Sequence, residues 1–332
     1  MPKKKKHVAS YVKLAKSGEL AKRVDALYEM LEACNICPRQ CSVDRMRTNY
    51  GDCGCGDVAL VSSVCDHHGE EPPISGFNGS GTVFFGSCNL RCVFCQNHQI
   101  SQPQGDGGFT EMDSTELAIN MMRLQKMGCH NINFVSPTHF APQMVAAVAD
   151  AQKMGLTIPI VYNSNGYDSV DVLELLDGVV DIYMPDLKYA DEDSAAEYSD
   201  APNYFFYASR ALKEMFRQVG PLQMDENGVA YRGLIVRHLV LPNDLAASAK
   251  VLKFIAEELS PDVFISLMSQ YRPVFKAARI KKLSRKVRMK EYQPLIDLLE
   301  ELGMENGYVQ DLHEAPDFYL PDFDKDHPFE DS

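Results

Sequence analysis

Residues 82–95 read TVFFGSCNLRCVFC, in which a short β-rich run passes directly into three closely spaced cysteines. The run predicts a strand, and Cys88, Cys92 and Cys95 follow it on the next loop. In a parallel barrel of βα units, loops at the carboxyl ends of the strands display the functional side chains. This stretch therefore predicts the start of a βα fold and a cysteine site at the end of its first strand.

Short β-rich runs continue to alternate with longer segments whose apolar residues recur at helical spacing. The runs occupy residues 82–87, 131–136, 158–165, 181–186, 233–240 and 263–268. The helical segments occupy residues 115–128, 141–155, 170–178, 208–220, 247–259 and 290–303. Six repeats are about two fewer than a closed eightfold barrel requires. We expect an α/β fold with a partial (β/α)6 open barrel and a small N-terminal Cys-rich metal-binding module.

The pattern divides the chain into four regions. An N-terminal helix and Cys-rich module is expected over residues 1–66, with its helix at 21–33. Turn residues dominate 67–80, which is expected to be a linking loop. The barrel itself is predicted for residues 81–305 and a C-terminal arm for 306–332. The tail from Asp311 shows no periodicity, so we expect it to be loosely attached.

Nine of the ten cysteines fall between Cys34 and Cys95. In an intracellular chain this clustering favours metal or cluster ligation over disulfides. The N-terminal candidates for a metal site are Cys34, Cys37, Cys41 and Cys53, with Cys55 as a competing fourth ligand. They could hold zinc or an auxiliary iron–sulfur cluster, and structural zinc is slightly favoured because a folding staple needs no open coordination position.

The cysteines of residues 88–95 supply three ligands, whereas a cluster held entirely by cysteines takes four. Together with Phe94 before the third cysteine, this CxxxCxxC loop resembles that of the radical S-adenosylmethionine (SAM) superfamily. The resemblance implies a [4Fe–4S] cluster whose open iron binds SAM and whose electron splits it into methionine and a 5′-deoxyadenosyl radical. The alternative is a zinc site or an electron-transfer cluster with a fourth ligand such as His98.

Polar residues follow four further predicted strands, and the resemblance implies that they bind SAM. They are Ser136, Thr138, Asn163, Asn165, Asp186, Lys188 and His238. The Asn-Gly and Asp-x-Lys pairs are similar to signatures of glycyl-radical-activating enzymes, in which the lysine could pair with the SAM carboxylate. The competing interpretations are a surface ion pair for Asp186 and Lys188 and a core histidine for His238. Strand alternation aims only one of Arg237 and His238 inward, and we expect His238.

The N-terminal cysteines together with residues 69–76, GEEPPISG, resemble one branch of pyruvate-formate-lyase-activating-enzyme-like proteins. The resemblance extends over roughly residues 30–305. It implies that the radical abstracts hydrogen from a glycine of a partner glycyl radical enzyme, with flavodoxin or ferredoxin as the one-electron donor. The alternatives are a small-molecule, peptide or RNA substrate, or a non-catalytic iron–sulfur or zinc protein.

Composition excludes some other classes. The net charge of −13, from 33 basic and 46 acidic residues, argues against general nucleic-acid binding, which needs clustered Lys and Arg. The sequence has no apolar stretch of the length that a membrane helix needs. The basic start, Met1 to Lys6, lacks the apolar segment of a secretory signal. We therefore expect a cytoplasmic protein without a membrane partner.

Overall fold

The fold, seen in a computed structural model that describes residues 7–102, 108–312, 321–325 and 327–329, is built on one ten-stranded sheet. The strand order is β10-β9-β8-β6-β5-β4-β2-β1-β3, and β7 pairs with β8 beside this path. The strands are β1 Ala59–His67, β2 Ser80–Phe85, β3 Thr110–Met112, β4 Ile132–Val135, β5 Ile160–Asn163, β6 Ile182–Tyr183, β7 Gln223–Met224, β8 Ala230–Leu239, β9 Phe264–Met268 and β10 Gly307–Val309.

The six runs predicted as strands correspond to β2, β4, β5, β6, β8 and β9, and neighbouring members of this set pair in parallel. At one edge of the sheet, β1 is antiparallel to β2, and β3 is antiparallel to β1. At the other edge, β10 is parallel to β9. Within the described residues no pairing joins β3 to β10, so the barrel is open. The predicted α/β fold with an open, mostly parallel barrel is confirmed.

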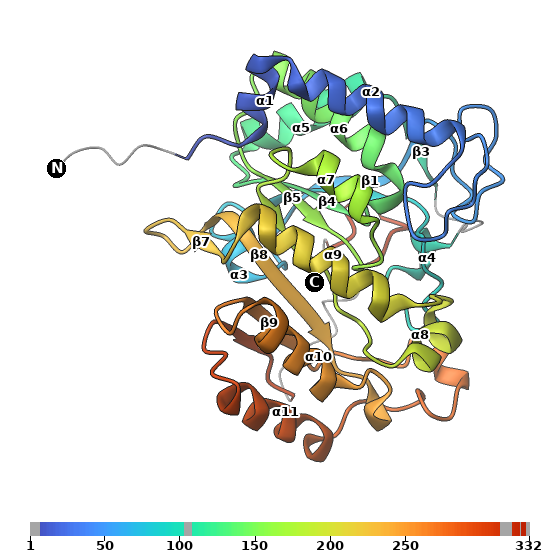
Figure 1. Cartoon of the computed structure of the whole chain (residues 1–332), viewed down its shortest axis with the longest axis vertical. Helices are drawn as coiled ribbons and strands as arrows, with labels where there is room; N and C mark the ends of the chain where they lie inside the picture. Colours follow the sequence, from blue (N-terminus) through green and yellow to red (C-terminus); the bar gives the residue numbers. More distant parts are fainter. Residues whose placement is uncertain (1–6, 103–107, 313–320, 326, 330–332) are drawn as a thin grey trace.

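Most of the helices cover the outer face of the sheet (Figure 1), whereas Ile74 of the short α3 packs against inward-facing strand residues. The described helices are α1 Tyr11–Ser17, α2 Glu19–Glu32, α3 Pro72–Ser75, α4 His98–Ser101, α5 Ser114–Met127, α6 Ala141–Met154, α7 Val170–Leu176, α8 Glu192–Ser199, α9 Tyr204–Val219, α10 Ser248–Phe254 and α11 Met289–Glu301. Helix α5 begins with a capping box of Asp113 and Glu116. None of the described helices has the length and apolar character needed to cross a membrane.

Successive side chains of each strand alternate between the helical layer and the barrel interior. Phe134, Tyr162 and Tyr183 face outward and belong to the main core. The inward residues include Val161, Ile182, Ile235 and Phe264, which form a smaller apolar cluster with Ile74 of α3. This cluster is the floor of the barrel. The next inward positions toward the carboxyl ends of the strands therefore lie between an apolar floor and the loops.

The sheet extends across both predicted boundaries of the barrel region. Strand β1 spans the expected junction at 66/67, and β10 lies in the expected C-terminal arm. The sequence of β1, ALVSSVCDH, carries Ser, Cys and Asp among its alternating positions, which hid its strand pattern. Helix α2, from the predicted N-terminal module, packs on α6 of the barrel (Figure 1). The helix, β1 and the barrel thus share one continuous packing arrangement.

The final described residues return to the barrel instead of extending away from it. Phe323 lies 5.3 Å from Phe84 between ring centroids, and Phe329 stacks on His67 at 3.9 Å. His327 Nε2 lies 3.0 Å from the carbonyl oxygen of Asp66. The tail predicted as a loosely attached arm therefore contacts β1 and β2 at these positions, while its residues 313–320 lie outside the described part.

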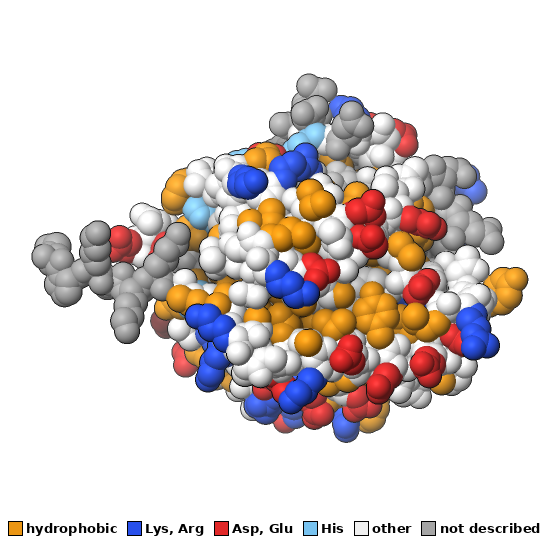
Figure 2. Space-filling view, turned by 90° about the horizontal axis from the view of Figure 1, so that it is seen from above, with side chains coloured by type: hydrophobic (Ala, Val, Ile, Leu, Met, Phe, Trp, Pro, Cys, Tyr) orange, Lys and Arg blue, Asp and Glu red, His pale blue; other side chains and the backbone are white. Residues whose placement is uncertain are grey.

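Acidic and basic side chains are interspersed over the face of the molecule seen in Figure 2, with hydrophobic side chains between them. On this face the basic side chains do not gather into one continuous area.

Candidate active site

A cavity of about 530 Å³ lies at the carboxyl ends of the parallel strands. Its walls include the three cysteines of residues 88–95 and polar residues from the loops after four other strands. The predicted site residues that line it are Cys88, Cys92, Phe94, Cys95, Ser136, Asn163, Asn165, Asp186 and Lys188. A cavity of similar volume beside β1 and β3 contains none of the predicted site residues. The structure thus gathers most of the predicted site around the first cavity.

Each sulfur of the CxxxCxxC loop has its own hydrogen-bond donor. Asn165 Nδ2 donates to Cys88 Sγ at 3.3 Å, and the hydroxyl of Ser199 donates to Cys92 Sγ at 3.1 Å. The hydroxyl of Ser101 donates to Cys95 Sγ at 3.2 Å. Hydrogen bonds of this kind stabilise thiolates and tune iron–sulfur clusters. The donor set therefore fits three sulfurs that carry negative charge.

Burial changes the pKa of two of these thiols. It raises the pKa of Cys95 to about 12 and also raises the pKa of Cys92, which Lys188 and the Ser199 hydroxyl partly oppose. Buried thiols therefore stay protonated unless a metal replaces the proton. No fourth cysteine lines this cavity among the described residues. These residues fit a [4Fe–4S] cluster, which Cys88, Cys92 and Cys95 would hold through three thiolates.

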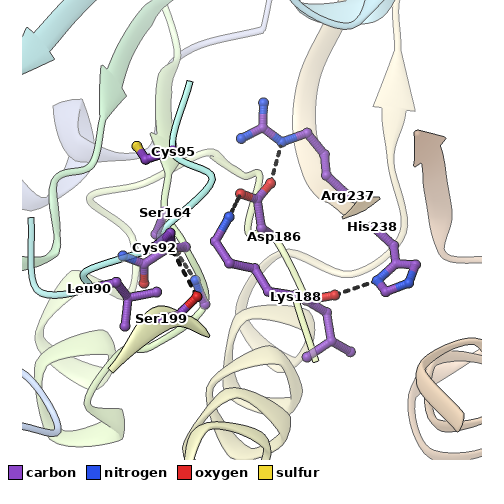
Figure 3. Close-up of polar contacts among 12 residues, drawn as sticks. Leu90, Cys92, Cys95, Ser164, Asp186, Lys188, Ser199, Arg237 and His238 are labelled. Carbon is purple, nitrogen blue, oxygen red and sulfur yellow. Dashed lines mark hydrogen bonds and ion pairs between the residues drawn. The ribbon is translucent and has the colours of Figure 1, made fainter. Parts of the chain in front are cut away.

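The cavity also holds a charged network that crosses the barrel (Figure 3). Asp186 accepts from Lys188 Nζ at 2.6 Å and from Arg237 Nε at 2.8 Å. Burial alone would raise the pKa of Asp186, but Arg237 and Lys188 outweigh it and lower the pKa. Burial disfavours the charge of Lys188, yet Asp186 and Cys92 hold its pKa above the usual value. Both groups are therefore charged inside the cavity.

Three residues of this network were not predicted from the sequence. Arg237 donates to Asn163 Oδ1 at 2.7 Å and forms ion pairs with Glu70 at 3.4 Å and Glu71 at 3.8 Å. Burial raises the pKa of Glu71 to about 7, with Arg237 opposing and Glu70 adding to the rise. The two glutamates come from the segment predicted as a linking loop. Its Pro and Gly content signalled turns but gave no sign that it enters the barrel.

His238 does not face the cavity, so its predicted placement is corrected. It is fully buried on the outer side of β8, where Nδ1 lies 2.6 Å from the carbonyl oxygen of Leu187 and Nε2 lies 2.8 Å from the hydroxyl of Ser248. Burial lowers its pKa to about 4, which leaves the imidazole neutral. Arg237 takes the inward position because adjacent residues of a strand point to opposite faces.

Thr138 is also placed away from the cavity. Its hydroxyl donates to the buried carboxylate of Asp168 at 2.7 Å, alongside donors from Ser164 and Tyr162. Burial raises the pKa of Asp168, and these three hydrogen bonds oppose the rise. The network fixes the loops after β4 and β5. Thr138 therefore helps to position these loops without lining the cavity.

The Asn165-Gly166 turn shows why this loop requires a glycine. Gly166 has φ +78°, and a Cβ there would lie 2.4 Å from the carbonyl oxygen of Asp186. That carbonyl accepts a hydrogen bond from the hydroxyl of Tyr204, which also donates to the Asn165 carbonyl. The close approach brings Asn165 against the cysteine loop and Asp186 into the same cavity.

His98, considered as a fourth ligand, does not line the cavity. It begins helix α4, and its ring stacks on Phe275 with centroids 4.9 Å apart. Phe94 does line the cavity, and its ring lies 5.8 Å from Tyr271 and 6.4 Å from Tyr189 between centroids. The aromatic contacts hold Phe94 beside the three cysteines.

The N-terminal cysteines lie outside the cavity, beside the CxxxCxxC loop. Cys34, Cys37, Cys53 and Cys55 are buried, and Cys41 is partly exposed. Cys53 and Cys55 form a hydrogen-bonded pair that lowers the pKa of Cys53 to about 6 and raises that of Cys55. Within the described residues, no three His, Cys, Asp or Glu side chains are already gathered as in a metal site. Any ligation here or in the cavity would therefore require thiol side chains to rotate.

Comparison with known proteins agrees with the site. A model of the radical SAM superfamily matches residues 82–220, from β2 to the end of α9. The uncharacterized protein MJ0674 of Methanocaldococcus jannaschii is 30% identical over 295 residues, which cover 86% of this chain and 80% of that protein.

Two solved structures are similar to this chain at low identity. HydG, a maturase of the [FeFe]-hydrogenase, is 12% identical with a TM-score of 0.48, over 90% of this chain and 63% of its own. This chain thus spans less than two thirds of the length of HydG. Methylornithine synthase (PylB) is 11% identical with a TM-score of 0.43, over 87% of this chain and 76% of its own.

The family match over the cysteine loop and parallel strands shows that the chain belongs to the radical SAM superfamily.

Proposed function

We propose that Cys88, Cys92 and Cys95 hold the [4Fe–4S] cluster that the superfamily implies, and that the cavity binds SAM for reductive cleavage. The observation that carries this proposal is the environment of the three sulfurs. Each has a separate hydrogen-bond donor, and all three line one cavity at which the described residues provide no fourth cysteine. When bound, the cluster supplies the electron that splits SAM into methionine and a 5′-deoxyadenosyl radical.

The cavity side chains have complementary tasks in this proposal. Lys188 presents a buried cation for the SAM carboxylate, and Asp186 holds that cation in place. Phe94 offers an aromatic face beside the cysteines for the adenine ring. Ser136 adds backbone groups at the end of β4. Arg237 contacts Asp186, Asn163 and Glu70, so it orients this wall of the cavity. It takes the inward position that was expected for His238.

We further propose that the radical abstracts hydrogen from a glycine of a partner enzyme, with flavodoxin or ferredoxin as the electron donor. The support is the resemblance of residues 30–305 to pyruvate-formate-lyase-activating-enzyme-like proteins. A small-molecule, peptide or RNA substrate would use the same cavity. Incubating the reduced enzyme with a candidate glycyl radical enzyme separates these cases. A glycyl radical signal in electron paramagnetic resonance (EPR) supports the first case, and 5′-deoxyadenosine without that signal supports the others.

The test of SAM cleavage uses protein reconstituted without oxygen, reduced with dithionite and mixed with SAM. We expect the wild type to release methionine and 5′-deoxyadenosine, measured by liquid chromatography and mass spectrometry. Cys92→Ala should reduce the yield to background because a cluster ligand is lost. Cys129→Ala is the matched control, since Cys129 is buried but lies outside the cavity. A cluster-loaded wild type that releases no 5′-deoxyadenosine contradicts the proposal.

A further inference from the structure

Arg45 is the largest charged side chain among the fully buried residues, with 1% of its surface exposed. Its guanidinium donates to three carbonyl oxygens: Cys55 at 3.0 Å, Gly56 at 2.8 Å and His139 at 2.8 Å. In the part of the chain that the structure describes, no carboxylate forms an ion pair with it. Among the described residues, the contacts of this buried cation are thus with neutral carbonyl oxygens, with the Phe140 ring at 5.8 Å and with the Cys34 thiol.

A buried guanidinium requires a compensating negative charge. Arginine stays protonated in proteins, and burying an uncompensated cation costs several kcal/mol even after relaxation. The carbonyl oxygens and the Phe140 ring around Arg45 are neutral, so they do not supply that charge. Arg45 Nη1 lies 4.0 Å from Cys34 Sγ. The negative charge available to Arg45 is therefore that of the N-terminal cysteines.

These cysteines lie on a long loop with no helix or strand of its own, from Ala33 to Val58. The backbone brings the segments of these cysteines together, because the Cys34 amide donates to the Val43 carbonyl and the Ser42 amide donates to the Cys34 carbonyl, each at 2.9 Å. The backbone amide of Asp52 also donates to Cys41 Sγ at 3.3 Å. A loop of this length without secondary structure is uncommon in a compact domain unless it has a function of its own. A bound metal would hold it together.

We propose that Arg45 is the buried countercharge of an anionic metal centre bound by the N-terminal loop. The ligands are the thiolates of Cys34, Cys37, Cys41 and Cys53. Four thiolates leave a net charge of about −2 around either Zn²⁺ or a [4Fe–4S]²⁺ cluster, so both centres suit a nearby cation. Cys55 stands outside the ligand set, because its carbonyl accepts from Arg45 at 3.0 Å and its thiol donates to the Cys53 carbonyl at 3.4 Å.

The same loop supports the CxxxCxxC cysteines. The hydroxyl of Ser87 donates to the Cys53 carbonyl, and Arg91 donates to the Asp52 carbonyl. Arg39 Nε donates to the Asn89 carbonyl at 3.0 Å and forms an ion pair with Asp52 at 2.9 Å. The metal centre would therefore hold residues 87–91 in place. This supporting role rests on the proposed function, whereas the metal site does not.

The experiment uses the full chain with Cys88→Ala, Cys92→Ala and Cys95→Ala combined, which removes the proposed radical cluster. After anaerobic loading with zinc, or with iron and sulfide, we expect about one centre per chain by elemental analysis. Adding Cys37→Ser should abolish binding, whereas adding Cys55→Ser should leave it intact. A folded triple variant that holds no metal under either loading overturns the proposal, as does equal retention by Cys37→Ser.

Total metal in the unmodified chain gives a second reading if the triple variant does not fold. We expect either bound zinc or a second cluster in addition to one four-iron cluster. A fully reconstituted chain with about four iron ions and no zinc contradicts the proposal. Because this count does not depend on SAM cleavage, it can fail independently of the proposed function.

Arg45 itself is tested by its effect on metal affinity. In the triple variant, Arg45→Met should raise the Kd for the metal roughly 10- to 100-fold, as measured by competition with a chelator. This range is typical for residues that contact metal ligands without binding the metal, roughly 10- to 100-fold in affinity. Arg45→Lys keeps the charge and should lose less. Unchanged affinity in Arg45→Met removes the countercharge role.

Discussion

The two groups of cysteines differ in the space and the charges around their sulfurs. Cys88, Cys92 and Cys95 line a cavity of about 530 Å³ that also holds the Asp186–Lys188 pair. None of the N-terminal cysteines lines that cavity, and the buried Arg45 lies 4.0 Å from the sulfur of one of them, Cys34. The contrast suggests that free space beside three sulfurs favours substrate chemistry, whereas enclosed sulfurs with a fixed countercharge favour a structural centre.

The largest expected difference is between a cysteine substitution in the cavity and one in the N-terminal loop, and it tests directly whether the two groups of cysteines have separate tasks. Cys88→Ala should eliminate release of 5′-deoxyadenosine, because the proposed cluster loses a ligand at the cavity. Cys37→Ala should lower the rate only in part, through a less rigid cluster loop. Both are measured as product per protein chain under single-turnover conditions. Equal and complete loss in the two variants would show that the regions do not have separate tasks.

Lys188→Met tests whether the positive charge in the cavity binds SAM. Losing a charge-assisted contact to the SAM carboxylate should raise the Kd of SAM roughly 10- to 100-fold, as measured by calorimetry on reconstituted protein. Lys213→Met is the matched control, since Lys213 pairs with Glu258 on the exposed surface. Its Kd should stay at the wild-type value. Similar Kd values for both variants would remove Lys188 from the binding site.

Neighbouring residues of β8 should separate activity from stability. Arg237→Met should lower the SAM cleavage rate, because it releases Asp186 and Asn163 in the cavity wall. His238→Leu should leave that rate nearly unchanged but lower the free energy of unfolding by about 1–3 kcal/mol. The reason is that it strands the buried Leu187 carbonyl and Ser248 hydroxyl. Denaturant titration and product assay distinguish them, and the reverse pattern would restore His238 to the cavity.

The smallest expected effect concerns His139, which joins the two regions. Its carbonyl accepts from Arg45, and its Nε2 lies 2.9 Å from the Gly86 carbonyl oxygen. Burial lowers its pKa to about 3, so the unfolded chain binds more protons below the ordinary histidine pKa of about 6.5. This titration changes the free energy of unfolding little near pH 7, and stability should fall progressively as pH drops from about 6.5 toward 3.

His139→Gln removes that titration while an amide can still donate to Gly86. The slope of unfolding free energy against pH should flatten below pH about 6.5. The slope is obtained from urea titrations at several pH values. An unchanged slope would mean that His139 does not stay neutral in the folded chain.

Local patterns predicted the parallel strands and the cysteine loop because each is encoded in a few consecutive residues. The run TVFFGS and its cysteines could be recognised without knowledge of the rest of the chain. Arg237 and His238 could not be assigned in this way, since a shift of one residue in a strand exchanges its two faces. Glu70 and Glu71 reach the cavity only because Ile74 anchors their segment in the barrel floor. Such long-range placement leaves no periodic signal.

The central claim is that one iron at the cavity has no protein ligand and binds SAM. Its most direct test is electron–nuclear double resonance on the reduced Cys37→Ser variant, which removes a ligand of the proposed second centre. We predict new couplings from SAM labelled with ¹⁵N at the amino group and ¹⁷O at the carboxylate. A reduced cluster whose spectrum stays the same with and without labelled SAM would contradict the account.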